Sequence, residues 1–116
     1  MPKRKLDPLP SAAFQILLAL AGEDLHGYGI MRQVEGQTDG RMRLGPGTLY
    51  SSIQSLLEEK FIAEVKPRGD AENGDERRRY YRLTSTGREL ARNEAERMAD
   101  LLRVARAKKI LRRGYV

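Results

Sequence analysis

The stretch GPGTLYSSIQSLLEEKFI, residues 45–62, decides the fold that we expect for this chain. Proline suits the first position of a helix, because its missing N–H would have no intrahelical partner there. The pattern therefore predicts a helix from about Pro46 to Lys60. Its apolar stripe, at the helical spacing i, i+4, i+7 and i+8, consists of Leu49, Ile53, Leu56 and Leu57.

The other faces of this helix carry small and hydrogen-bonding side chains rather than many charges. These faces hold Gly47, Ser51, Gln54, Ser55 and Glu58. A helix that enters the major groove of DNA needs this character, because bulky residues would hold it away from the base edges. In the alternative, a helix that only faces solvent, we would expect more lysine and glutamate. The composition therefore favours a recognition helix.

A β-hairpin is expected directly after this helix. Residues 61–68, FIAEVKPR, are predicted to form the first strand. The polar loop 69–76 follows and contains Asn73-Gly74, which is a strong turn signal. The return strand is expected over Arg77–Leu83, RRRYYRL, so basic residues flank the tip of the hairpin.

Two further helices are expected before the recognition helix. Residues 12–21 are apolar on nearly all sides, as in a helix that is buried against several neighbours. Ser11 is a plausible N-cap for this helix, and Gly22 a natural stop. A second helix should begin near Gly27 and end before Gly36, where a glycine-rich connector leads to the third.

The last predicted helix is capped by Thr84 and runs from about Ser85 to Lys109 or beyond. It is too long and too polar to be buried in a small domain. Its narrow apolar stripe consists of Met98, Leu101, Leu102 and Ala105. Such a stripe needs a partner, so we expect a homodimer held by this helix. Phe14 or Leu17 of the first helix would add to the dimer interface.

The charge of the chain indicates a polyanionic partner. Its 116 residues, enough for one domain, carry a net charge of +6. Segment 106–113 alone holds five basic residues and no acidic one. Nucleic acid fits this balance first and an anionic membrane second, although a plain solvated basic surface would give the same charge.

Several other classes are disfavoured by what the sequence lacks. There is no cysteine, and there is one histidine, His26, so a disulfide framework or a cysteine metal site is excluded. No apolar run approaches the roughly 18 residues of a membrane span, and no signal-peptide pattern follows the basic N-terminus. We therefore expect a cytoplasmic protein without a metal or other cofactor.

The order of these elements predicts a mainly α fold with a small β-hairpin, namely a winged helix-turn-helix with a long C-terminal dimerisation helix. We expect a basic N-terminal arm at 1–10, the DNA-binding domain at 11–84, and the dimerisation helix with its basic tail at 85–116. No nucleophile–base pair, catalytic carboxylate pair or nucleotide phosphate loop is recognisable. Enzyme activity is therefore not expected.

Three segments resemble the PadR family of transcriptional regulators, and together the resemblance covers about residues 11–105. HGYGIMRQV, residues 26–34, is similar to the family's second helix, and residues 45–62 are similar to its recognition helix. RRRYYRLTSTGREL, residues 77–90, is similar to its second wing strand and the start of the following helix. Gly45 departs from the serine cap that is frequent in the family, which weakens only the helix cap.

The resemblance implies a repressor that dimerises through its terminal helices and binds an inverted repeat in duplex DNA. It places near the major groove Thr48, Tyr50, Ser51 and Gln54. It also places Gly47 and the hydroxyl of Tyr28 near the phosphate backbone. Both tyrosines have an alternative position, Tyr28 half-buried in the core and Tyr50 at the edge of the apolar stripe.

The wing supplies the remaining candidates for contact with phosphates or the minor groove, some of which would be plain solvated charges. They are Lys66, Arg68, Arg77, Arg78 and Arg79. Tyr81 and Leu83, on the inner face of the wing, are expected in the core. His26 is expected to be a structural residue at the entrance of the second helix rather than a site residue.

Two questions about binding partners stay open at this level. Some PadR relatives bind planar drugs or phenolic compounds at the dimer interface, but this chain has no tryptophan to stack on such an inducer. An RNA- or ribosome-associated protein would explain the basic charge equally well, but not the recognition helix followed by a wing. A pure protein-interaction module would leave the basic wing without a role.

Overall fold

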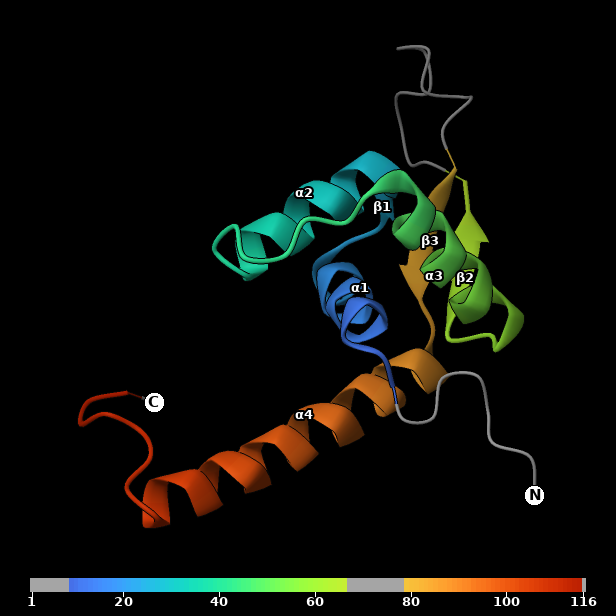
Figure 1. Cartoon of the computed structure of the whole chain (residues 1–116). Helices are drawn as coiled ribbons and strands as arrows, with labels where there is room; N and C mark the ends of the chain where they lie inside the picture. The colour runs from blue at the N-terminus through green and yellow to red at the C-terminus, as the bar shows by residue number, and fades with distance from the viewer. Residues whose placement is uncertain (1–8, 67–78, 116) are drawn as a thin grey trace.

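The structure, a computed structural model, describes residues 9–66 and 79–115 of the chain. Within these residues it contains four helices and three short strands (Figure 1). In chain order they are α1 (Ser11–Gly22), β1 (Leu25–His26), α2 (Gly27–Gln37), α3 (Pro46–Glu58), β2 (Ile62–Val65), β3 (Tyr80–Leu83) and α4 (Ser85–Ala107). This is the winged helix-turn-helix that was expected, with α2 and α3 as the helix pair and β2 and β3 as the wing.

Helix α1 lies at the centre of the fold and packs against α2, α3, α4 and β3. These neighbours cover α1 from several directions, which explains why its side chains are apolar on nearly all sides. The N-cap of α1 is Pro10 and not Ser11, and the cap makes no side-chain hydrogen bond. The carbonyl of Pro10 accepts the first helical hydrogen bond, from the N–H of Phe14 at 3.0 Å, so Ser11 is already the first helical residue.

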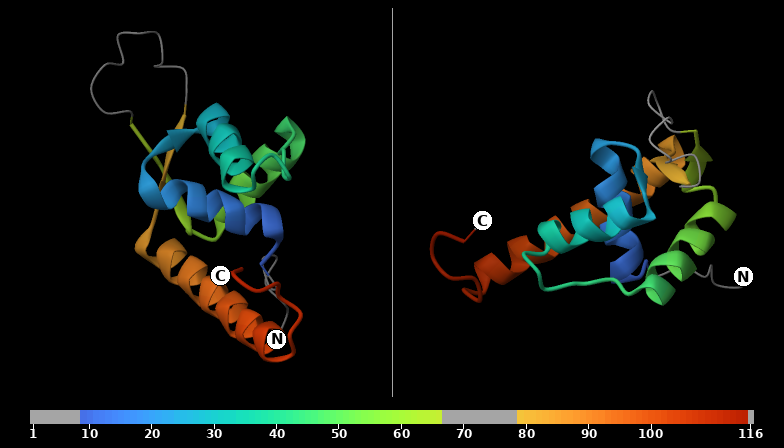
Figure 2. Two further views of the ribbon diagram at one scale, coloured as in Figure 1. Left: turned by 90° about the vertical axis from the view of Figure 1, so that its left-hand side faces the viewer. Right: turned by 90° about the horizontal axis from the view of Figure 1, so that it is seen from above.

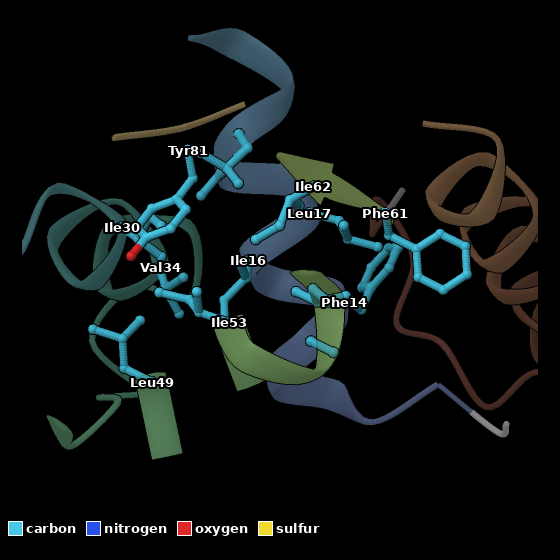
Figure 3. Close-up of a cluster of buried hydrophobic side chains, with 14 of the residues drawn as sticks. Phe14, Ile16, Leu17, Ile30, Val34, Leu49, Ile53, Phe61, Ile62 and Tyr81 are labelled. Atoms are coloured by element: carbon cyan, nitrogen blue, oxygen red, sulfur yellow. The ribbon is translucent and has the colours of Figure 1, made fainter. Parts of the chain in front are cut away.

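The hydrophobic core joins α1 to α2, to α3 and to the wing (Figure 3). The stripe predicted for α3 is confirmed, because Leu49, Ile53 and Leu56 are buried and Leu57 is partly buried against the core. Burying each such side chain stabilises the fold by about 1.5–3 kcal/mol. Tyr81 is buried as expected, and Leu83 packs against the core beside it.

The sheet has three strands rather than the two of a simple hairpin. The strand order is β1-β3-β2, and β1 pairs antiparallel with β3 through Leu25 opposite Tyr81 and His26 opposite Tyr80. Strand β2 pairs with the other edge of β3. Both wing strands are shorter in the described residues than the sequence predicted. Two residues carry no detectable periodicity, so β1 could not be predicted from the pattern.

A carboxylate clamp holds β3 against the segment that precedes β1. Arg82 on β3 donates to the carboxylate of Asp24 through Nη2 at 2.8 Å and through Nε at 3.1 Å. This bidentate geometry is the strongest form of the arginine–carboxylate pair, and it raises the pKa of Arg82. The contact joins residues that are 58 positions apart in the sequence.

The turn after α3 differs slightly from expectation. The helix ends at Glu58 instead of Lys60, and Lys60 adopts the left-handed conformation with a φ of 63°. The N–H of Phe61 donates to the carbonyl of Leu56 at 2.9 Å, which closes the end of the helix and directs the chain into β2.

The predicted cap of α4 is confirmed, because Thr84 Oγ1 accepts from the N–H of Gly87 at 3.0 Å.

Helix α4 packs on the domain with its N-terminal part, from Gly87 to Met98. Gly87 and Ala91 are buried, and Leu90 and Met98 pack partly against the core. The C-terminal end of α4 extends away from α1 and α3, as Figure 1 and the left view of Figure 2 show. The unpartnered helix that the sequence predicted is therefore present in the structure of the single chain.

Candidate nucleic-acid interface

The start of α2 is organised by His26. Its Nδ1 accepts a hydrogen bond from the N–H of Gly29 at 2.9 Å, so the imidazole acts as the N-cap of the helix. Its ring also lies edge-on to Tyr80 of the wing, with 5.2 Å between centroids, and stacked at 6.4 Å from Tyr28. The expected structural role of His26 is therefore confirmed. Through these contacts the residue ties α2 to β3.

Tyr28 lies on the surface, with 57% of its area exposed. The structure therefore does not support the alternative of a half-buried core tyrosine. Arg32, one helical turn further along, donates from Nη1 to Tyr28 Oη at 3.1 Å, and its guanidinium carbon lies 5.8 Å from the centroid of the tyrosine ring. Sequence reasoning missed Arg32, although the i, i+4 spacing on α2 could have indicated the pair.

Tyr50 connects the recognition helix to α2. A Cβ added to Gly27 would lie 2.6 Å from Tyr50 Oη, so the tyrosine occupies space that only glycine leaves open at the first position of α2. The ring is nevertheless 54% exposed. Tyr50 therefore holds the two helices together at the surface.

The outer face of α3 presents Thr48, Ser51 and Gln54 to solvent. Gly47 is exposed as well, and a Cβ there would meet nothing within 4 Å. Gln54 donates to the carboxylate of Glu58 at 3.4 Å, a long contact that would be easily exchanged for another partner. Ser55, which the pattern placed on the outer faces, is buried instead. Apart from the exposed Tyr50, the exposed side chains near the beginning of α3 are therefore polar, uncharged and mostly small.

Two of the basic residues that the sequence proposed for DNA contact by the wing lie within the described part of the chain. Lys66 is exposed, and Arg79 is exposed with its Nε 3.9 Å from the carboxylate of Glu64. Arg68, Arg77 and Arg78, which the sequence also proposed, lie outside the described residues.

These groups come together because three elements meet at one place. Figure 1 shows the beginnings of α2 and α3 beside the wing strands. The contact of Tyr50 with Gly27 joins α3 to α2, and the contact of His26 with Tyr80 joins α2 to β3. A recognition helix flanked by a helix N-terminus and a wing is the arrangement by which this fold reads duplex DNA.

The proposed dimer residues do not share one environment. Leu101 and Leu102 are 55% and 46% exposed, Val104 beside them is also exposed, and Ala105 is half-buried. Met98 packs partly against the core of its own chain. Among the described residues, Leu101, Leu102 and Val104 therefore form an apolar surface that this chain leaves open, and we name it the α4 stripe.

The contribution expected from α1 requires a correction. Leu17 is fully buried and Phe14 nearly so, because α1 lies at the centre of the fold and its neighbours cover both side chains. Neither residue reaches the surface. Leu18 is the exposed large apolar residue of α1, and its burial state depends on helix packing that the sequence pattern does not show.

Other kinds of site find little support in the described part of the chain. No group of three or more histidine, aspartate or glutamate side chains is arranged there to hold a metal ion. None of the described helices has both the length and the apolar content to span a bilayer.

Comparison with known proteins identifies the same arrangement elsewhere. The sequence model of the Transcriptional regulator PadR-like family matches residues 16–93. A PadR family transcription regulator from Clostridium difficile is 22% identical, with a TM-score of 0.72, over 84% of this chain and 97% of that chain. A transcriptional regulator from Clostridium thermocellum is 25% identical, with a TM-score of 0.68, over 83% of this chain and 87% of that one.

Two further relatives extend the comparison. RosR from H. salinarum is 21% identical, with a TM-score of 0.66, over 91% of this chain and 93% of that chain. An uncharacterized 37.1 kDa protein in a transposon of Streptomyces fradiae is 39% identical over 90 residues, which are 78% of this chain but 24% of the relative. The chain thus spans about a quarter of the length of this curated relative.

Proposed function

Because this chain belongs to the PadR-like family of transcriptional regulators, we propose that it is a repressor that binds an inverted repeat in duplex DNA as a homodimer. The family and the similar structures are transcription regulators, so regulation through DNA binding, rather than catalysis, is the activity that they support. The observation that carries the proposal is the single surface formed by the exposed face of α3, the start of α2 and the wing.

Each part of this surface has a distinct role in the proposal. Thr48, Ser51 and Gln54 of α3 contact base edges in the major groove, where hydrogen-bonding side chains distinguish the bases. Gly47 allows a phosphate to approach the first turn of α3, where backbone N–H groups attract an anion. The phosphate contacts of the wing come from its basic residues, namely Lys66, Arg68, Arg77, Arg78 and Arg79.

Tyr28 and Tyr50 have supporting positions in this proposal. Tyr28 offers its hydroxyl to the phosphate backbone. Tyr50 keeps α3 at a fixed distance from α2, and its exposed edge contacts the DNA beside the recognition residues. A rigid relation between the two helices lowers the cost of ordering the interface when DNA binds.

The dimer is proposed to form through the α4 stripe. Leu18 of α1, rather than Phe14 or Leu17, would add to the dimer interface. A two-fold axis would bury two copies of the stripe together and set two recognition helices about one turn of DNA apart. Residues 11–84 would then form the DNA-binding unit, and 85–116 the dimerisation helix with its basic tail.

Release by a small molecule completes the proposal. A hollow of about 520 Å³ lies between α1, the connection from α2 to α3, and the C-terminal tail. The hollow is open to solvent and lined mainly by polar side chains, so it lacks the enclosed, mostly apolar character of a typical ligand site. The residues that line it are Gln15, Gln37, Thr38, Asp39, Arg41, Met42 and Tyr115.

Selection of bound sequences from random duplex DNA tests the main proposal. We expect enrichment of an inverted repeat whose half-site centres lie about 10 base pairs, or one helical turn, apart. Binding to structured RNA at the same salt concentration serves as the comparison. Failure to enrich any sequence, or equal affinity for RNA, would contradict the proposal and favour a general nucleic-acid-binding protein.

A further inference from the structure

The contact between Tyr28 and Arg32 lies on the proposed DNA-binding surface but has no assigned role. Both side chains are exposed, so the contact contributes little to the stability of the core. It nevertheless fixes two flexible groups with a hydrogen bond of 3.1 Å and a cation–π contact of 5.8 Å. The contact therefore holds two polar groups in place on the surface that would meet the DNA.

The direction of the hydrogen bond between Arg32 and Tyr28 determines which of their donors remain available to a ligand. Arg32 Nη1 donates and Tyr28 Oη accepts, so the hydroxyl proton of Tyr28 is not used in this bond and can be donated to another acceptor. A guanidinium carries five N–H donors in a planar fork, and this bond uses one of them. The pair therefore presents an O–H and further N–H donors side by side, with a permanent positive charge behind them.

The electrostatic surroundings favour an anion at this place. Tyr28 lies in the first turn of α2, where the helix dipole is positive, and Arg32 follows one turn later. Glu35 is the acidic residue whose charge acts on Arg32, and its carboxylate is itself 3.7 Å from the guanidinium of Arg43. The negative charge beside Arg32 is thus partly compensated.

The position of the pair relative to the wing is also defined. His26 caps α2, stacks on Tyr28 and also contacts the ring of Tyr80 on β3. A group bound between Tyr28 and Arg32 would therefore keep a constant distance from the wing and, through Tyr50, from α3. The regular spacing of phosphates along a DNA strand requires such a constant distance.

We propose that Tyr28 and Arg32 together form a binding site for one phosphate of the DNA backbone. This inference rests on the proposed function and deepens it by adding Arg32 as a contact. Tyr28 donates its hydroxyl proton to one phosphate oxygen, and Arg32 donates an N–H to the same phosphate and supplies the charge. The bond between the two side chains orders both donors before DNA arrives, which reduces the entropy lost on binding.

The test combines protein variants with DNA that lacks single backbone charges. The selected binding site is prepared with one methylphosphonate, which is uncharged, at each backbone position in turn. For the wild-type protein we expect one position per half-site where this replacement weakens binding about fivefold at 0.15 M salt, the effect of one lost phosphate contact. In Arg32→Gln and in Tyr28→Phe the same replacement should weaken binding much less.

Arg32→Gln should also weaken binding to the selected site and to random DNA by a similar factor, and it should reduce the salt slope by about one contact. Arg92→Gln on α4 is the matched control, because it removes the same charge from an exposed residue far from α2. The control should leave the methylphosphonate pattern and nearly all of the affinity unchanged.

The outcomes distinguish failure of the phosphate site from failure of the proposed DNA-binding function. If wild-type protein binds its selected site but Arg32→Gln behaves like Arg92→Gln, the phosphate site is refuted while the DNA-binding function stands. If the Arg32→Gln variant weakens binding but stays sensitive to every methylphosphonate, Arg32 acts on overall charge alone and the site is again refuted. Absence of DNA binding by the wild-type protein would overturn the proposed function itself.

Discussion

Gly87, in the first turn of α4, lies directly against the backbone of Phe61 at the start of the wing. A Cβ built on Gly87 would overlap the carbonyl oxygen of Phe61 and come 2.8 Å from its carbonyl carbon. The same carbonyl accepts hydrogen bonds from the N–H of Thr84 at 3.2 Å and from its Oγ1 at 2.9 Å. The absence of a side chain at this residue therefore allows α4 to begin close to β2.

Gly87→Ala is expected to lower the free energy of unfolding by about 1–3 kcal/mol or more, because backbone atoms cannot move aside as a flexible side chain could. Gly36→Ala is the control in α2, since a Cβ there meets nothing within 4 Å. It should stabilise the helix by about 0.5–1 kcal/mol. Urea unfolding of both variants measures the difference, and equal stabilities would show that the crossing is not tight.

Gln54 allows a test at the scale of one residue of whether α3 contacts bases. Its side chain is exposed and makes only the long contact with Glu58. Gln54→Ala should cost roughly 1–3 kcal/mol of binding on the selected site and much less on random DNA. Titration of both DNAs by fluorescence anisotropy gives the two values. An equal loss on both would assign Gln54 to the backbone and not to a base.

At the scale of elements, the relation between α2 and α3 depends on the contact of Tyr50 with Gly27. The tyrosine hydroxyl lies where a side chain at Gly27 would be. The two helices of the DNA-binding pair therefore approach each other through a bulky residue on one and a missing side chain on the other. Neither helix pattern alone contains this information.

A double-mutant cycle can isolate this helix contact. Gly27→Ala alone should lower the free energy of unfolding by less than about 1 kcal/mol, because the half-exposed Tyr50 ring can move aside, but the displaced ring should weaken DNA binding. In a Tyr50→Ala background the space is empty, so adding Gly27→Ala should cost close to nothing. Thermal unfolding of the four proteins gives the coupling energy. Purely additive effects would mean that Tyr50 does not fill this space in solution.

At the scale of the whole molecule, α4 divides the chain into a packed part and a projecting part. The N-terminal part of the helix covers α1, and Arg88 donates to the carbonyl of Ala21 at 3.3 Å. The C-terminal part carries the α4 stripe beyond the domain (Figure 2). Burying each large apolar side chain of this stripe would contribute about 1.5–3 kcal/mol, which favours a second copy as the partner.

Leu101→Asp combined with Leu102→Asp should convert the proposed dimer to monomers, because four charges would meet in one apolar interface. The monomers should keep their helical content and bind an inverted repeat far more weakly. Sedimentation velocity and circular dichroism measure the two properties. Arg92→Gln with Arg103→Gln changes the net charge equally on other faces of α4, and this control should stay dimeric. A dimer that survives the double aspartate variant would place the interface elsewhere.

The amino-acid sequence alone determined most features that depend on neighbouring residues. The stripe of α3, the cap at Thr84, the entrance of α2 at His26 and the projecting helix α4 all follow from short patterns of polarity and capping. Local patterns succeed here because a helix depends on contacts within a few residues of the chain. The order of these elements was then enough to predict the fold class.

Tertiary structure decided which side chains are covered and which distant groups meet. Strand β1 exists because β3 offers an edge to two residues that have no pattern of their own. Phe14 and Leu17 are buried by neighbours from several parts of the chain, and the bond between Asp24 and Arg82 joins segments far apart in sequence. Periodicity shows that a face is apolar, but only the packed chain determines whether its own core or a partner covers it.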